Sequence, residues 1–178
     1  MFKYLLKFLI LSLFFTACTF TPSSISQNRV EELSELSALL ESLDSSIPSK
    51  EAKLLSNDIF QEVATLRQKF NPTSQAQFNN FLINVGVKEK GLCYDWSDAL
   101  YLHFSKKEYS HFEFHLLVAH KGKYFSEHNT LVVVIKGGKV LDGIVIDPWR
   151  NSEKLYFSKV GADKKYEWRH REKRGCLH

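Results

Sequence analysis

Three residues in the second half of the chain carry the side chains that covalent catalysis by a thiolate requires. Cys93 opens a predicted helix, His128 begins an apolar strand, and Asp147 ends the next strand. In such catalysis the sulfur attacks a carbonyl carbon, an imidazole moves the proton, and a carboxylate orients the imidazole. The free N–H groups and the dipole at a helix start also favour an anion at Cys93. The three residue types therefore indicate a thiol reaction.

The strands that carry His128 and Asp147 are predicted to form a hairpin. A two-residue turn at Gly137-Gly138 would join them. In that register His128 lies directly opposite Asp147, on one face, with the two side chains roughly 5 Å apart. A slip of one residue, through a bulge in the connection, would place the two side chains on opposite faces.

Other histidines compete with His128 for the role of base. His115 lies within a predicted strand, His120 lies in a turn, and His103 lies on the helix of Cys93 and cannot easily reach its start. No His-x-x-x-His or Cys-x-x-Cys spacing accompanies them, so the sequence indicates no metal site. We predict that His128 is the partner of Cys93 and that the reaction needs no cofactor.

The N-terminus reads as an export signal. Lys3 and Lys7 precede a short apolar stretch, which is too short to span a bilayer of roughly 30 Å. It ends in Phe15-Thr16-Ala17-Cys18, which resembles a bacterial lipobox. The prediction is a lipoprotein signal peptide, with acyl chains such as palmitate on Cys18 anchoring the chain to a membrane without crossing it. The alternative is an ordinary secretory signal with a cysteine nearby by chance.

The residue after Cys18 bears on localisation. It is Thr19, and no aspartate of the inner-membrane retention type follows the cysteine. In a Gram-negative cell this favours the outer membrane, with the protein facing the periplasm. Cys93 and Cys176 then remain in a compartment that permits disulfides. The alternative to a reactive thiol is a stabilising Cys93–Cys176 disulfide, although the last residues of a chain are an unfavourable place for such a bond.

Composition indicates one α+β domain with short appendages. The 178 residues are 44% hydrophobic, and the net charge of +4 becomes +2 when Lys3 and Lys7 are removed with the signal. We expect N-terminal helices, then the helix of Cys93 packed on a small antiparallel sheet. The apolar positions of the helix after residue 73, Phe78, Phe81, Leu82 and Val85, are predicted to form a core or docking face, and the alternative is a partner-binding role. The predicted segments are a signal peptide (1–17), a tether (18–27), a helical region (28–72), a catalytic core (73–158) and a basic tail (159–178).

Basic residues crowd the predicted tail. The simplest interpretation is a solvated segment, and the alternative is contact with anionic lipid head groups or a cell-wall polymer. Nucleic acid is not an expected partner of an exported lipoprotein.

Two motifs resemble a known family. The run Cys93-Tyr94-Asp95-Trp96-Ser97 is similar to the Cys-x-Asp-aromatic-small pattern of bacterial transglutaminase-like cysteine peptidases, a branch of the papain-like superfamily. Asp147-Pro148 resembles the Asp-Pro that often ends the last catalytic strand of transglutaminase-core domains. The likeness covers roughly residues 75–157.

The resemblance implies a papain-like or transglutaminase-like core. Cys93 would be the nucleophile, His128 the general base and acid, and Asp147 the orienting group. The chain departs from the family at Asn129, which stands where a small apolar residue is usual.

The expected reaction is acyl transfer from an amide. Transfer to water would make the protein a cysteine peptidase or amidase, and transfer to an amine would make it a transglutaminase. The predicted envelope location suggests an envelope protein or a peptidoglycan peptide as substrate. The remaining alternative is a non-catalytic lipoprotein that uses the same fold as a binding module.

Overall fold

The computed structural model describes residues 23–73, 75–123, 125–151 and 154–174. The predicted signal peptide, Cys18 and Cys176 lie outside these ranges. The chain forms two compact units that divide within the first described helix, α2 (Ser23–Glu41), after Glu31. In the described part of the chain, no helix has the length and hydrophobicity needed to cross a membrane.

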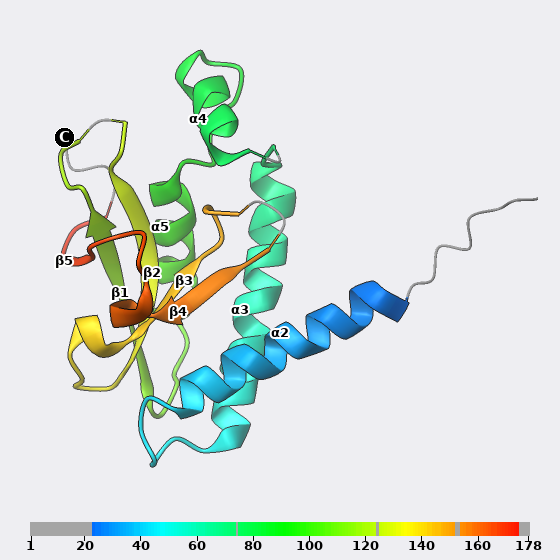
Figure 1. The fold of residues 1–178 in the computed structure, drawn as a ribbon, viewed down its shortest axis with the longest axis vertical. Coiled ribbons are helices and arrows are strands. Elements are labelled where there is room, and N and C mark those ends of the chain that lie inside the picture. The colour runs from blue at the N-terminus through cyan, green and yellow to red at the C-terminus, as the bar shows by residue number, and fades with distance from the viewer. Residues whose placement is uncertain (1–22, 74, 124, 152–153, 175–178) are drawn as a thin grey trace, which may run out of the picture. The chain divides into compact units, whose positions relative to one another are not determined.

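The second unit, from Glu32 onward, is built on one sheet. Five antiparallel strands lie in the order β4-β3-β2-β1-β5 (Figure 1). Their bounds are β1 (Phe112–Ala119), β2 (His128–Ile135), β3 (Ile144–Asp147), β4 (Tyr156–Lys159) and β5 (Arg169–Arg171). The first three begin and end where the apolar runs of the sequence predict. Together with the helices, this sheet confirms the α+β prediction.

Helices cover one face of the sheet. The helices of this unit besides the end of α2 are α3 (Ser49–Phe70), α4 (Ala76–Asn84) and α5 (Cys93–Phe104). Trp96, Leu100 and Phe104 of α5 pack with Leu131 and Val133 of β2 in the main core, which also includes the apolar stripe of α3. In Figure 1, α5 lies between the sheet and α3. This packing places the first turn of α5 at the end of β2 where His128 begins the strand.

Segments without long helices cover the opposite face. Val132, Val134 and Val145 pack there against Val160 and Trp168. Because side chains alternate along β2, His128 belongs to this face and Asn129 to the face of α5. Polar side chains therefore lie on both faces of the sheet at the start of β2, next to α5.

The predicted hairpin register is wrong by two residues. Leu131 pairs with Ile146, so the residue opposite Asp147 in this register is Thr130, and not His128. The cause is the connection between β2 and β3, which contains a short 3-10 helix (Val140–Asp142) and is longer than a two-residue turn. A register shift of two residues leaves every side chain on the same face of the sheet, so His128 and Asp147 still lie on one face.

The prediction of a solvated basic tail from residue 159 is wrong for the backbone, which is folded, although the described basic side chains other than Arg171 are exposed. β5 pairs with β1, and Trp168 and Arg171 are buried. Arg171 donates hydrogen bonds to Ser97 and Asp98 of α5. The partners of Arg171 lie more than 70 residues away in the sequence, so the basic run itself does not indicate its burial. The predicted tether also differs from the structure, since its described part, from Ser23, is helical.

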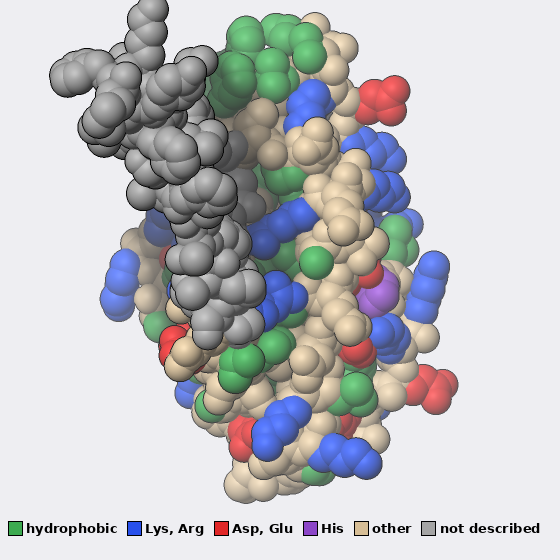
Figure 2. All heavy atoms as spheres, turned by 90° about the vertical axis from the view of Figure 1, so that its right-hand side faces the viewer, with side chains coloured by type: hydrophobic (Ala, Val, Ile, Leu, Met, Phe, Trp, Pro, Cys, Tyr) green, Lys and Arg blue, Asp and Glu red, His purple; other side chains and the backbone are tan. Residues whose placement is uncertain are grey.

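The apolar stripe of α4, predicted as a core or docking face, is largely exposed and does not belong to the core. Phe78, Phe81 and Val85 are exposed, with the Phe78 and Phe81 rings stacked, while Ala76 and Asn79 are buried. Figure 2 shows hydrophobic side chains gathered at the α4 end of the molecule. Helical periodicity predicted a correct helix here, but not which face turns inward.

Candidate active site

Cys93 is the first residue of α5, and the preceding chain is held in place by side chains. Asp95 accepts hydrogen bonds from the N–H groups of Gly91 (2.9 Å) and Leu92 (3.0 Å), which caps the helix start. Gly91 has a φ of +124°, and a Cβ there would lie 2.9 Å from Nδ2 of Asn79. The glycine is therefore required by backbone conformation and packing. Asp95 therefore caps the N-terminus of α5, as its position in the first turn suggests.

The sulfur of Cys93 lies at the start of β2, between the carbonyl of Glu127 and the side-chain amide of Asn129. The thiol donates to the carbonyl oxygen of Glu127 at 3.8 Å, and Nδ2 of Asn129 donates to the sulfur at 3.8 Å. Cys93 is a free thiol with 7% of its surface exposed. The small exposed part opens into a cleft.

His128 and Asp147 form a buried pair. Nε2 of His128 lies 2.6 Å from Oδ2 of Asp147, and each side chain is 1% exposed. Burial lowers the pKa of His128, but the Asp147 charge and hydrogen bond, together with the neighbouring Cys93 side chain, raise it to about 9. Burial raises the pKa of Asp147, and the positive charges of His128 and Arg150 bring it below its usual value. At neutral pH the pair is an imidazolium and a carboxylate.

The imidazole ring is enclosed by aromatic rings. The ring centroids of Trp149, Tyr166 and Trp168 lie 4.7, 4.6 and 5.5 Å from that of His128. Nδ1 of His128 is buried and has no hydrogen-bond partner among the described residues. With Nε2 taken by Asp147, Nδ1 is the nitrogen left to exchange a proton in the cleft.

A second ion pair supports Asp147. Arg150 donates from its backbone N–H to Oδ1 of Asp147 (3.1 Å) and from Nε to Oδ2 (2.9 Å). The other end of the guanidinium bonds both oxygens of Asp163, and Asp163 also accepts from the Trp168 indole at 2.9 Å. Arg150 stacks on the ring of Tyr156 at 3.7 Å. The orientation of Asp147 is thus fixed by Arg150, which follows β3, and indirectly by Asp163, which lies in the predicted tail.

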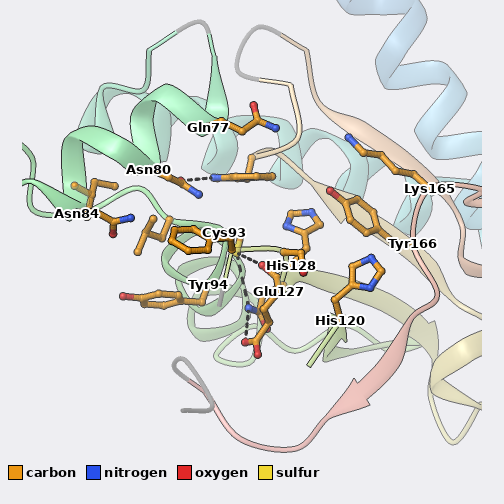
Figure 3. Close-up of a pocket in the computed structure, with 16 residues that line it drawn as sticks. Gln77, Asn80, Asn84, Cys93, Tyr94, His120, Glu127, His128, Lys165 and Tyr166 are labelled. Atoms are coloured by element: carbon orange, nitrogen blue, oxygen red, sulfur yellow. Dashed lines mark hydrogen bonds between the residues drawn. The ribbon is translucent and has the colours of Figure 1, made fainter. Parts of the chain in front are cut away.

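A cleft of about 650 Å³ leads to the sulfur. One wall comes from α4, where Gln77, Asn80 and Asn84 present uncharged amides at helical spacing (Figure 3). Oδ1 of Asn80 accepts from the Trp149 indole at 3.2 Å, which fixes its orientation. Phe125 and Tyr166 also line the cleft. The cleft therefore combines neutral hydrogen-bonding groups with aromatic surface.

The competing histidines lie elsewhere or at the cleft mouth. His103 pairs with Glu62 at 3.0 Å, and His115 pairs with Glu113 at 3.0 Å in mid-strand. His120 has a φ of +52° in a turn and contributes to the cleft lining. In the described ranges, no three side chains of the usual metal-ligating types converge.

Several residues of the site were missed by sequence reasoning. Asn80, Asn129, Trp149, Arg150 and Tyr166 reach the site through tertiary contacts. Only Asn129 carried a signal, since it is a polar residue in an otherwise apolar run and adjoins His128. The three predicted residues, Cys93, His128 and Asp147, lie together at the end of the cleft.

Comparisons with known proteins supply no relative for this site. No protein-family model matches the chain, and the searches of curated proteins and of solved structures also returned no match.

Proposed function

We propose that this protein is a thiol-dependent acyl-transfer enzyme with a papain-like or transglutaminase-like core, and that it acts as a cysteine peptidase or amidase. The observation that carries the proposal is the buried His128–Asp147 contact of 2.6 Å beside the thiol of Cys93. A buried imidazolium–carboxylate pair contributes poorly to stability compared with apolar packing. Its position at the end of a cleft therefore favours a chemical role.

The reaction begins with the proton already on the imidazole. Because its pKa is raised to about 9, His128 holds a proton at neutral pH and favours a thiolate on Cys93. The thiolate attacks the carbonyl carbon of an amide, and a C–S bond forms. The N–H of Cys93, in the first turn of α5, has no acceptor within the helix, and in this proposal it binds the developing oxyanion.

The amide bond then breaks with transfer of a proton. Nδ1 of His128 gives its proton to the leaving amine, and a thioester remains on Cys93. Water attacks the thioester while the neutral imidazole takes its proton, which releases a carboxylic acid and restores the imidazolium and thiolate. The amides of Gln77, Asn80 and Asn84 offer donors and acceptors of the kind that a peptide main chain pairs with.

The anchor and substrate location are part of the proposal. The lipobox at Cys18 would attach the protein to the cell envelope, with the outer membrane favoured. An envelope protein or a peptidoglycan peptide would then be the substrate.

The test is alkylation of the full chain by iodoacetamide at pH 7, followed by peptide mass spectrometry that separates Cys93 from Cys18 and Cys176. We expect rapid labelling of Cys93 and a loss of at least about tenfold in rate in His128→Ala, because the thiolate fraction falls without the imidazolium. His115→Ala is the matched control, since that histidine also pairs with a carboxylate but lies in mid-β1. Slow labelling of the unmodified protein, or a Cys93–Cys176 disulfide, would contradict the proposal.

A further inference from the structure

Asn129 delivers an amide to the sulfur from the face of the sheet opposite to His128. The two residues are consecutive in β2, so their side chains emerge on opposite faces. Asn129 is 2% exposed, and its Nδ2 lies 3.8 Å from Sγ of Cys93. The first two residues of β2 thus supply an imidazole from one face of the sheet and an amide from the other.

Asn129 occupies its position at a cost in stability. Leu131 and Val133, the next residues on the same face, are fully buried apolar side chains. Oδ1 of Asn129 is buried without a hydrogen-bond partner among the described residues. A buried polar atom without a partner is unfavourable, and an apolar side chain would avoid that cost. Packing therefore does not explain why an amide stands here.

Glu127 determines which end of the amide faces the sulfur. Oε1 of Glu127 lies 3.3 Å from Nδ2 of Asn129, and Oε2 accepts the N–H of Gly122 at 2.7 Å. A carboxylate only accepts hydrogen bonds, so it selects the NH₂ end of the amide. The second hydrogen of that NH₂ group is then available to the sulfur.

The two contacts of the sulfur suit its two protonation states. The neutral thiol can donate to the Glu127 carbonyl, and the thiolate can accept from Asn129. A donor to an ionised acceptor is stronger than a donor to a neutral one, so the amide contact favours the thiolate. We propose that Asn129 is a catalytic residue that stabilises the thiolate of Cys93 through its Nδ2–H group. This rests on the proposed thiol chemistry and adds a residue to it.

Other ionisable groups lie around the start of α5 and along the cleft. They are Glu127 just before β2, His128 from β2, Asp147 from β3, Tyr94 and Asp95 from α5, and His120, Lys165 and Tyr166 in the cleft lining. Substitutions of Asn129 remove none of these groups, and Glu127 keeps its hydrogen bond to the N–H of Gly122. A change in the pH dependence of the thiol between such variants therefore reports the amide contact.

The experiment measures the rate of iodoacetamide alkylation of Cys93 in the full chain from pH 4 to pH 10. Asn129→Leu is nearly isosteric and Asn129→Ala avoids overpacking, so one of the two is expected to fold, as checked by circular dichroism. We expect each folded variant to shift the alkylation midpoint upward by about one pH unit, a tenfold change in thiolate fraction, with the limiting rate at high pH retained. Thr130→Val is the control, because it removes a buried hydrogen bond of β2 that goes to Ile146 and not to the sulfur.

The outcomes separate the inference from the proposed function. A midpoint in both Asn129 variants equal to that of the unmodified protein would overturn the role of Asn129. If labelling is insensitive to His128→Ala but the Asn129 shift persists, the proposed function fails and the amide contact stands.

Discussion

The imidazole of His128 contacts the carboxylate of Asp147 at 2.6 Å, although the two residues are offset by two positions in the β2–β3 ladder. Both side chains are 1% exposed, so the contact is made out of reach of solvent. The charge of each group depends on the other and on Arg150. This coupling makes stability depend on pH in a definite direction.

We predict that the stabilising contribution of His128 declines between about pH 6.5 and pH 9. Its pKa is raised from 6.5 in the unfolded chain to about 9 in the fold, so its contribution is complete below 6.5 and is lost as the pH rises through 9. Asp147 has a lowered pKa, so its contribution is complete above 3.8 and is lost on acidification. Urea unfolding at pH 6, 7.5 and 9.5 should show the difference between the unmodified protein and His128→Gln shrink by up to about 3 kcal/mol. A difference that does not vary with pH would contradict this account.

Removing the guanidinium of Arg150 should destabilise the fold strongly. Arg150 is the shared cation of Asp147 and Asp163, whose side chains are each 1% exposed. Arg150→Met leaves the buried carboxylates of Asp147 and Asp163 without their shared cation. We expect a loss of about 3–5 kcal/mol in unfolding free energy. The control is Arg169→Met, because Arg169 and its partner Glu167 are 75% and 86% exposed. That variant should stay within about 0.5 kcal/mol in the same denaturation experiment.

Gly91→Ala should strain the turn that precedes Cys93. Gly91 has a φ of +124°, and the new Cβ would lie 2.9 Å from Nδ2 of Asn79. We expect a loss of about 1–3 kcal/mol in thermal or chemical unfolding. Gly161→Ala is matched to it, since Gly161 has neither a positive φ nor an atom within 4 Å of an added Cβ. Equal stability of the two variants would show that Gly91 is not constrained as described.

The segment after residue 159 should be required for folding. Trp168 is 5% exposed, packs with Val132 and Val145, and donates to Asp163. Trp168→Ala is expected to cost about 3–5 kcal/mol. Glu167→Ala, at the exposed neighbouring position, should change stability by less than about 0.5 kcal/mol. A small effect of Trp168→Ala would restore the interpretation of this region as a solvated tail.

Local patterns in the sequence determined the elements of the site. The apolar runs that begin at His128 and end at Asp147 have the strand bounds predicted for them, and Cys93 begins its helix as predicted. These features depend on periodicity and on residues within a few positions of each other. The shared face of His128 and Asp147 was also predictable, because any even shift in register preserves it.

The tertiary structure alone decided how those elements meet and what supports them. The connection between β2 and β3 contains a 3-10 helix, so the register differs from that of a tight hairpin. The inward face of α4 and the burial of Arg171 depend on partners that lie far away in the chain. Asn129 and Arg150 enter the site for the same reason. Periodicity shows on which face of its own helix or strand a residue lies. Which other element packs against that face is decided by the packing of the whole chain.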